Sequence, residues 1–201
     1  MRAEAGRVPY TRSELEEELS RNHQASFGWA LNCCRGNDAD AADVLQDAYL
    51  KVLEGRARFE GRSTFRTFLF GVIRRTAQER RRRRRVRRAV VWMLGGDPPP
   101  AEDPSHVVQR SERTRRLAEA LGRLSARQRE VLQLVFYEGM TIAEAATAMG
   151  TSVGTARTHY ERGKRRMRRL LASDSEGVAG GRPKLARTVP ERVGEREGDS
   201  R

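Results

Sequence analysis

Arginine supplies most of the side chains in this chain that could bind a ligand. Six arginines follow one another from Arg80 to Arg85, and residues 71–95 hold ten basic residues against one acidic residue. A second excess lies in residues 126–171, with nine basic residues against four acidic ones. Guanidinium groups pair with phosphate oxygens through parallel hydrogen bonds, so two such blocks indicate two surfaces for a nucleic acid. A solvated basic face would explain one charge run, but it is the weaker explanation of two blocks that each end a helical pattern.

Residue types typical of catalytic or metal sites do not cluster in the sequence. The three histidines, His23, His106 and His159, are scattered, and no metal-ligand spacing or phosphate-binding loop occurs. The only two cysteines, Cys33 and Cys34, are adjacent, which excludes a disulfide framework. We therefore predict no catalytic residue, no metal and no other cofactor, and we expect a protein that is not an enzyme.

Length and composition favour a small all-helical protein. The chain has 201 residues, of which 37% are hydrophobic and 6% aromatic, and its net charge is +13. A core with so few aromatic residues is built from Leu, Val, Ile and Ala, which suits small helical units. No apolar run approaches the length of a membrane span, and the N-terminus lacks the apolar core of a secretion signal. We therefore expect a cytoplasmic protein that does not enter a membrane.

Hydrophobic periodicity and capping residues predict three helices in the first half of the chain. One helix is expected over 13–34, opened by a capping box of Ser13 and Glu16. A second should begin at Asp40 as its N-cap and end near residue 54. A glycine-containing loop then precedes a third helix over 65–85, which carries the six arginines.

A proline-rich segment separates this half from the next. Four prolines within residues 98–104 exclude a helix there. The boundaries that follow are 1–12 for a disordered N-terminus, 13–92 for the first domain, 93–113 for a flexible linker, 114–172 for the second domain and 173–201 for a disordered tail. Extended at roughly 3.3 Å per residue, residues 93–111 would span about 60 Å. We therefore expect two tethered helical domains, and a single merged globule with its arginines buried would contradict this arrangement.

The second domain has the pattern of a helix-turn-helix. Capping boxes at Ser125 and Thr141 open two short helices, and a turn from Gly150 leads into a third helix with a bare polar face. Such a face suits the major groove, where arginine pairs with guanine and threonine contacts a thymine methyl group or a phosphate. We predict that this recognition face consists of Ser152, Thr155, Arg157, Thr158, Arg162 and Arg165.

Two segments of the chain resemble one protein family. DADAADVLQDAYLKVLEGRARFEGRSTFRTFLFGVIRR, residues 38–75, resembles the core-binding and promoter-melting region of sigma-70 family factors of the extracytoplasmic-function (ECF) group. LSARQREVLQLVFYEGMTIAEAATAMGTSVGTARTHYERGKRRMRRLL, residues 124–171, resembles the fourth region of the same family. The matches extend over roughly residues 25–88 and 117–171. Finding both segments in this order is a more specific signal than either one alone.

The resemblance implies a role for each surface. A sigma factor directs core RNA polymerase to promoters and is not itself an enzyme. The second helix would dock on the clamp helices of the largest polymerase subunit, and the second domain would contact the flap of the second-largest subunit. The docking face would be Asp43, Gln46, Asp47 and Leu50. The −10 element would be bound by Phe59, Gly61, Arg62, Ser63, Thr64, Arg74, Arg75, Arg81, Arg82 and Arg85. The recognition face would read the −35 element, and an anti-sigma protein is a further partner that the resemblance admits.

Two other functions stay open on the sequence. A free-standing helix-turn-helix regulator would bind palindromic DNA without polymerase, and its N-terminal half would only dimerise. A basic RNA-binding or chromatin-like structural protein would show no preference among DNA sequences. The paired segments favour the sigma factor.

Overall fold

The computed structural model describes residues 10–93 and 112–173. Within these ranges the chain forms eight α-helices and one π-helical turn, with no strand, which confirms the all-α prediction. No helix in the described part of the chain is long and apolar enough to cross a membrane. The prolines of the predicted linker, and almost all of the two ends predicted to be disordered, lie outside the described residues.

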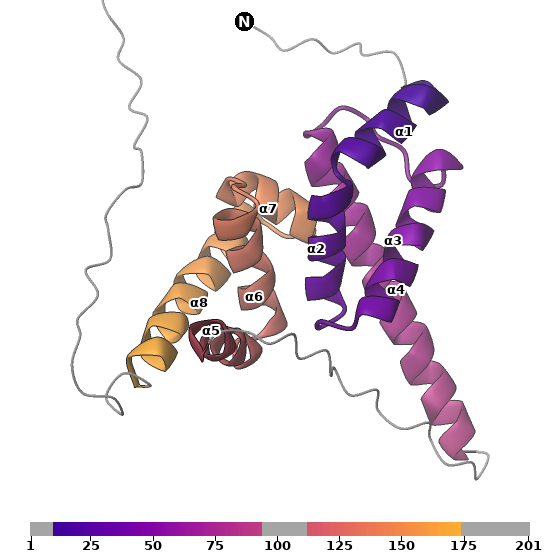
Figure 1. Cartoon of the computed structure of the whole chain (residues 1–201). Coiled ribbons are helices and arrows are strands. Elements are labelled where there is room, and N and C mark those ends of the chain that lie inside the picture. The colour runs from indigo at the N-terminus through magenta and orange to yellow at the C-terminus, as the bar shows by residue number, and fades with distance from the viewer. Residues whose placement is uncertain (1–9, 94–111, 174–201) are drawn as a thin grey trace, which may run out of the picture.

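The N-terminal unit contains α1 (Arg12–Arg21), α2 (His23–Cys33), α3 (Asp38–Leu53) and α4 (Phe65–Met93). Helix α4 has 29 residues and is therefore about 43 Å long. Most of its length packs against α2 and α3, and its C-terminal end extends beyond them (Figure 1). The core of the unit is centred on Trp29 of α2, whose ring stacks on Phe70 of α4 and whose Nε1 donates a hydrogen bond to the Phe70 carbonyl oxygen at 2.9 Å.

Two predicted helix starts are wrong in this unit. The helix expected over 13–34 is divided into α1 and α2 at Asn22, and its capping box is Thr11 with Glu14. Helix α3 is capped by Asn37, whose Oδ1 accepts a hydrogen bond from the Asp40 amide at 2.7 Å. Asp40, predicted as this cap, lies within the first turn of α3.

The C-terminal unit contains α5 (Glu112–Gly122), α6 (Ala126–Leu132), the π-turn η1 (Gln133–Tyr137), α7 (Ile142–Met149) and α8 (Val153–Ser173). The capping boxes predicted at Ser125 and Thr141 are both present. Gly150 ends α7 in the left-handed conformation with φ of 59°, which glycine adopts without steric strain. These local signals place α7 and α8 as a helix-turn-helix.

The two units lie in direct contact, and their buried side chains form one continuous core. The contact is centred on α4 and α7, which lie side by side (Figure 1). A β-carbon added to Gly71 of α4 would lie 3.6 Å from the carbonyl oxygen of Ala148, so small residues let the two backbones come close. Across the same contact, Gln133 donates a hydrogen bond to the Gly28 carbonyl oxygen at 3.2 Å. The structure is thus a closed arrangement of two units, where the sequence predicted modules joined only by a linker.

Two ion pairs join the units through buried carboxylates. Arg74 Nε lies 3.0 Å from Glu130 Oε2, and their side chains are only 5% and 13% exposed. Arg66 donates to both the carboxylate and the backbone carbonyl oxygen of Glu138, and its guanidinium lies over the Phe70 ring. Burial raises the pKa of the Glu138 carboxyl, and the nearby Arg66 charge opposes that shift. Removing Glu130 would therefore leave the buried charge of Arg74 unmatched, and removing Arg66 would leave the buried carboxylate of Glu138 unmatched.

Candidate nucleic-acid interface and docking surfaces

The loop before α4 is held by an aromatic cluster. The Phe59 ring lies 5.5 Å from Tyr10, 5.6 Å from Phe65 and 5.4 Å from Phe68, between ring centroids. Phe59 is half-buried, so most of its ring anchors the loop. Tyr10 precedes the first helix and was not singled out by the sequence. The cluster fixes the position of the loop relative to α4.

The other predicted loop residues divide into exposed groups and a cap. Gly61 has φ of 71°, which gives the loop its turn. Arg62 is exposed and forms an ion pair with Glu60 at 3.0 Å. Thr64 accepts a hydrogen bond from the Thr67 amide at 3.2 Å, and the Ser63 hydroxyl donates to the Thr64 carbonyl oxygen at 3.1 Å. Thr64 therefore caps α4, while Arg62 and its partner Glu60 both face solvent.

Helix α4 divides its arginines between two roles. Arg80 pairs with Asp43 at 2.9 Å and Asp47 at 3.2 Å, and Arg84 pairs with Asp40. Arg81 Nη2 donates to the Cys33 carbonyl oxygen at 2.6 Å. These three arginines therefore hold α4 against α2 and α3. Arg82, Arg83, Arg84 and Arg85 are all exposed, and of these four only Arg84 is paired with a carboxylate of α3.

The two arginines before this run are placed differently. Arg75 is exposed and available to a phosphate. Arg74 is buried against Glu130 in the contact between the units. Its predicted contact with the −10 element therefore requires the two units to separate, and it stays a prediction.

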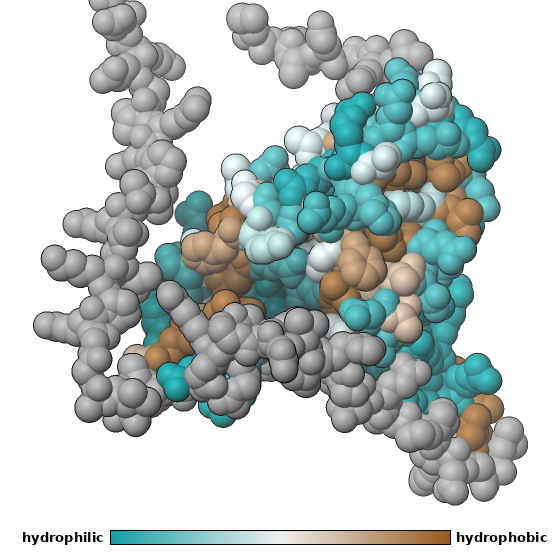
Figure 2. All heavy atoms as spheres, viewed as in Figure 1, coloured by the Kyte–Doolittle hydropathy of each residue, from teal (hydrophilic) through white to brown (hydrophobic). Residues whose placement is uncertain are grey.

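The predicted docking face on α3 lies at the edge of an apolar groove. Leu50 is 41% exposed, and with Gln46 it lines a groove of about 420 Å³ between α2 and α3. His23, Phe27, Leu45, Tyr49 and Leu53 also line it. Figure 2 shows apolar side chains gathered between these two helices. Asp43 and Asp47 lie on the same helix and both pair with Arg80.

The predicted recognition face on α8 is exposed at all six positions. Ser152 caps the helix by accepting a hydrogen bond from the Thr155 amide at 3.1 Å. The Thr158 hydroxyl donates to the Gly154 carbonyl oxygen at 2.9 Å, so its methyl group is the part left for a ligand. Backbone amides at a helix N-terminus favour a phosphate, and Arg157 follows one turn later. The exposed recognition face is therefore free to contact a major groove, as predicted from the sequence.

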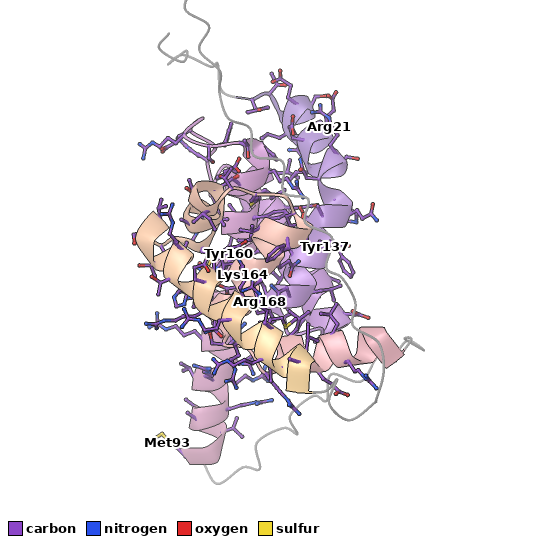
Figure 3. The ribbon with its side chains drawn as sticks, turned by 90° about the vertical axis from the view of Figure 1, so that its left-hand side faces the viewer. Arg21, Met93, Tyr137, Tyr160, Lys164 and Arg168 are labelled. Carbon is purple, nitrogen blue, oxygen red and sulfur yellow. The ribbon has the colours of Figure 1, made fainter. Side chains whose placement is uncertain are left out.

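The C-terminal unit also carries an apolar groove that the sequence analysis did not predict. It has a volume of about 920 Å³ and lies between α5, η1, α8 and the edge of α2. Tyr160, Lys164 and Arg168 follow one another along α8, and Tyr137 lies beside them (Figure 3). Phe136 and Tyr137 are 65% and 80% exposed although they are aromatic. The adjacent aromatic residues Phe136 and Tyr137 were the signal in the sequence that could have revealed this groove. The π-turn at 133–137 is an irregularity of the kind that often marks a functional site.

Together these surfaces define a class of protein. It is an all-helical DNA-binding protein of the helix-turn-helix type, with an additional helix-lined apolar groove and a separate arginine-bearing helix.

Comparison with known proteins gives the family. The chain matches the family model described as Sigma-70 region 2 over residues 19–88 and the model described as Sigma-70, region 4 over residues 114–167. It is 30% identical over 134 residues to the ECF RNA polymerase sigma factor SigX of Bacillus subtilis, which is 64% of this chain and 69% of the relative. It is 29% identical over 143 residues to the ECF sigma factor BldN of Streptomyces coelicolor, covering 70% of this chain and 54% of the relative.

Solved structures agree with this result. The sigma factor RpoE of Bartonella quintana, solved in complex with the anti-sigma factor NepR, matches with a TM-score of 0.63 and 25% identity over 81% of this chain and 99% of that chain. CnrH, solved with the cytosolic domain of CnrY, matches with a TM-score of 0.56 and 24% identity, over 82% of this chain and 92% of that chain, which supports the fold alone. The chain belongs to the sigma-70 family, in its ECF group, and is a sigma factor that directs RNA polymerase to promoters.

Proposed function

We propose that this sigma factor uses three separate surfaces to bring core polymerase to a promoter. The docking face and its groove bind the clamp helices of the largest subunit, through Leu50 and Gln46 at the rim. The loop 59–64 and the exposed arginines of α4 hold the −10 element. The recognition face on α8 reads the −35 element. The observation that carries this proposal is one chain with an exposed helix-turn-helix face on one unit and an apolar groove lined by Gln46 and Leu50 on the other.

The apolar groove of the C-terminal unit fits an amphipathic helix that carries acidic residues. Its lining includes Leu121, Phe136 and Met167, and Lys164 and Arg168 lie among them as cations. A helix that inserts apolar anchors every three or four residues would bury this surface. We assign the groove to the flap of the second-largest polymerase subunit. An anti-sigma protein that presents a similar helix would compete for it. Because core polymerase is the proposed partner, the cytoplasm is the proposed location.

The closed arrangement is not the promoter-bound one. Promoter elements two helical turns apart are separated by about 70 Å. Ala148 touches α4 in the structure, and the five-residue step to Val153 spans at most about 18 Å. The start of the recognition helix is therefore too close to α4 for both elements to be bound at once. Promoter binding requires the units to separate, which also releases Arg74 and Arg66.

The proposal is tested by binding to purified core RNA polymerase. The protein should co-elute with core on size exclusion, and the complex should initiate from a subset of a randomised promoter library. Leu50→Asp should weaken the complex at least about tenfold, because it places a charge at the rim of an apolar groove. Val90→Asp is the matched control, since Val90 is similarly exposed at 48% but lies outside the groove.

Two outcomes would count against the proposal. Wild-type protein that never co-elutes with core but shifts a palindromic duplex would favour the free-standing regulator. Equal weakening of core polymerase binding by Leu50→Asp and Val90→Asp would contradict the assignment of the docking face.

Removing the first arginine of the recognition face should reduce sequence discrimination. Arg157→Ala is expected to weaken binding to the preferred −35 sequence by about 1–3 kcal/mol and to relax the preference at one base pair. The measurement is competition binding with single-base variants of the selected promoter. Arg165→Ala, three helical positions beyond Arg162, serves as the comparison. Equal weakening on all sequences would assign Arg157 to a phosphate.

A further inference from the structure

A cavity of about 380 Å³ opens where the turn between α2 and α3 faces the second half of α4. Its floor includes the apolar side chains Cys33, Val44 and Ala77. Six arginines line it: Arg35, Arg80, Arg81, Arg84, Arg85 and Arg88. The single carboxylate among its lining residues is Asp40. A volume of a few hundred Å³ is typical of sites for small molecules, so the charge excess sits in a space of ligand size. We call this space the arginine cavity.

One of these arginines has an unusual backbone conformation. Arg35 follows the end of α2 with φ of 60°, and it is the only non-glycine residue with positive φ in the described ranges. The Gly36 amide donates to the Leu31 carbonyl oxygen at 2.8 Å and the Arg35 amide to the Asn32 carbonyl oxygen at 3.2 Å, which is a Schellman motif. Glycine usually occupies the position that Arg35 holds. A strained non-glycine residue at the mouth of a cavity indicates that its side chain has a role there.

Two of the other arginines are paired with carboxylates, and the rest of the positive charge around the cavity is not matched. Arg80 and Arg84 are fixed by carboxylates of α3, and Arg81 by the Cys33 carbonyl oxygen. Among the residues that the structure describes, Arg35, Arg85 and Arg88 have no carboxylate at ion-pair distance. The pKa of the neighbouring Arg129 is lowered by burial and then by the Arg35 charge, which places two cations near one another at this end of the molecule. An anion bound here would meet fixed donors and unmatched positive charge.

We propose that the arginine cavity binds a small molecule with two or more adjacent phosphate groups. Each guanidinium can give two parallel hydrogen bonds to a phosphate, and several converge on one space. Phosphates joined directly to one another concentrate more negative charge in this volume than the spaced phosphates of a DNA strand. The apolar floor leaves room for a compact organic part, so polyphosphate and nucleoside polyphosphate share the required chemistry. Arg81 and Arg85 were predicted at promoter phosphates, and this site gives them a second use in the free protein.

The test is calorimetric titration of the full chain with linear tripolyphosphate at fixed ionic strength. Arg35→Gly removes the guanidinium and relieves the positive φ, so the variant should stay folded and melt no earlier than wild type. We expect it to weaken tripolyphosphate binding at least about tenfold, and Arg88→Ala to weaken it measurably. Arg82→Ala is the matched control, because Arg82 is an exposed arginine of the same helix that does not line the cavity. It should leave the affinity unchanged.

Further arms separate the sources of phosphate. ATP that binds more tightly than tripolyphosphate would identify a nucleoside polyphosphate, and equal affinity would identify the phosphates alone; both support the site. A short DNA duplex of random sequence is titrated in parallel, and Arg35→Gly should change its affinity no more than Arg82→Ala does. Equal loss of tripolyphosphate binding in Arg35→Gly and Arg82→Ala would overturn the proposal, as would no binding to wild type. Neither result bears on core polymerase binding, which Leu50→Asp tests separately.

Discussion

Replacing Glu130 by alanine should open the closed arrangement of the two units. Glu130 is the partner of Arg74 across the contact, with Nε and Oε2 3.0 Å apart, and both side chains are nearly excluded from solvent. Without the carboxylate, Arg74 would be left as an unpaired buried charge. Breaking a buried pair from one side costs about 3–5 kcal/mol, which is larger than most single contacts. Separation of the units lets Arg74 reach water and is the expected response.

The measurement is the radius of gyration of the full chain by small-angle X-ray scattering. The Glu130→Ala variant should be more extended than wild type, while each unit keeps its helical content. Glu161→Ala is the control, since Glu161 lies on the same unit, is 56% exposed and forms only a 3.8 Å pair with Lys164. Its effect on stability should stay below about 0.5 kcal/mol. Replacing both partners, as Arg74→Met with Glu130→Leu, should restore compaction because no charge is then buried alone. An unchanged radius for Glu130→Ala would mean that the pair does not hold the units together.

Truncating Trp29 should produce the largest loss of stability in the N-terminal unit. Trp29 is fully buried, its ring stacks on Phe70 at a centroid distance of 5.7 Å, and its Nε1 bonds the Phe70 carbonyl oxygen. Replacing a buried tryptophan by alanine costs about 3–5 kcal/mol through lost burial and the cavity left behind. That is a large fraction of the stability of a small domain, which is about 5–15 kcal/mol. Equilibrium denaturation in urea should show a much lower midpoint for Trp29→Ala.

The variant Trp29→Phe separates the contribution of the buried aromatic ring from that of the Nε1 hydrogen bond. It keeps an aromatic ring in the core and removes the Nε1 donor, so the expected loss is smaller, about 1–3 kcal/mol. Phe27→Ala, at a half-buried position of the same helix, serves as the control for loss of an aromatic side chain. A Trp29→Ala variant within about 1 kcal/mol of wild type would contradict the central position of this residue in the core.

Local signals in the sequence were sufficient to predict where the helices of the C-terminal unit begin. The capping boxes at Ser125 and Thr141 involve residues three positions apart, so the chain forms them without help from distant segments. The same rule failed at α1 because Thr11 and Ser13 each have a glutamate three residues later. Tyr10 and Leu15 occupy the two positions of a hydrophobic staple around Thr11, and both are half-buried, which favours the earlier frame. The division at Asn22 has no glycine or proline to announce it.

The ion pairs between residues far apart in the chain could not be predicted from the sequence. Arg80 and Asp43 are separated by 37 residues, and Arg74 and Glu130 by 56, so their pairing depends on how the helices pack. A run of arginines is uniform in the sequence, whereas in the structure its members face different neighbours. For the same reason the alanines of α7 and Gly71 indicated only small residues, not the contact between two units. Residue type indicated which segments are basic, but not which arginines within them are buried or paired.

The pairing of Arg80 and Arg84 with α3 needs an arginine at two positions of the helix, and the unbroken run supplies one at each. Each residue added to an α-helix turns everything after it by about 100° around the axis. An extra arginine inserted between Arg80 and Arg84 would swing Arg84 away from Asp40 and bring another arginine into its place. The ion pairs with α3 would therefore persist, and the rotation would change only the direction in which the residues after the run, Val86, Arg87 and Arg88, face.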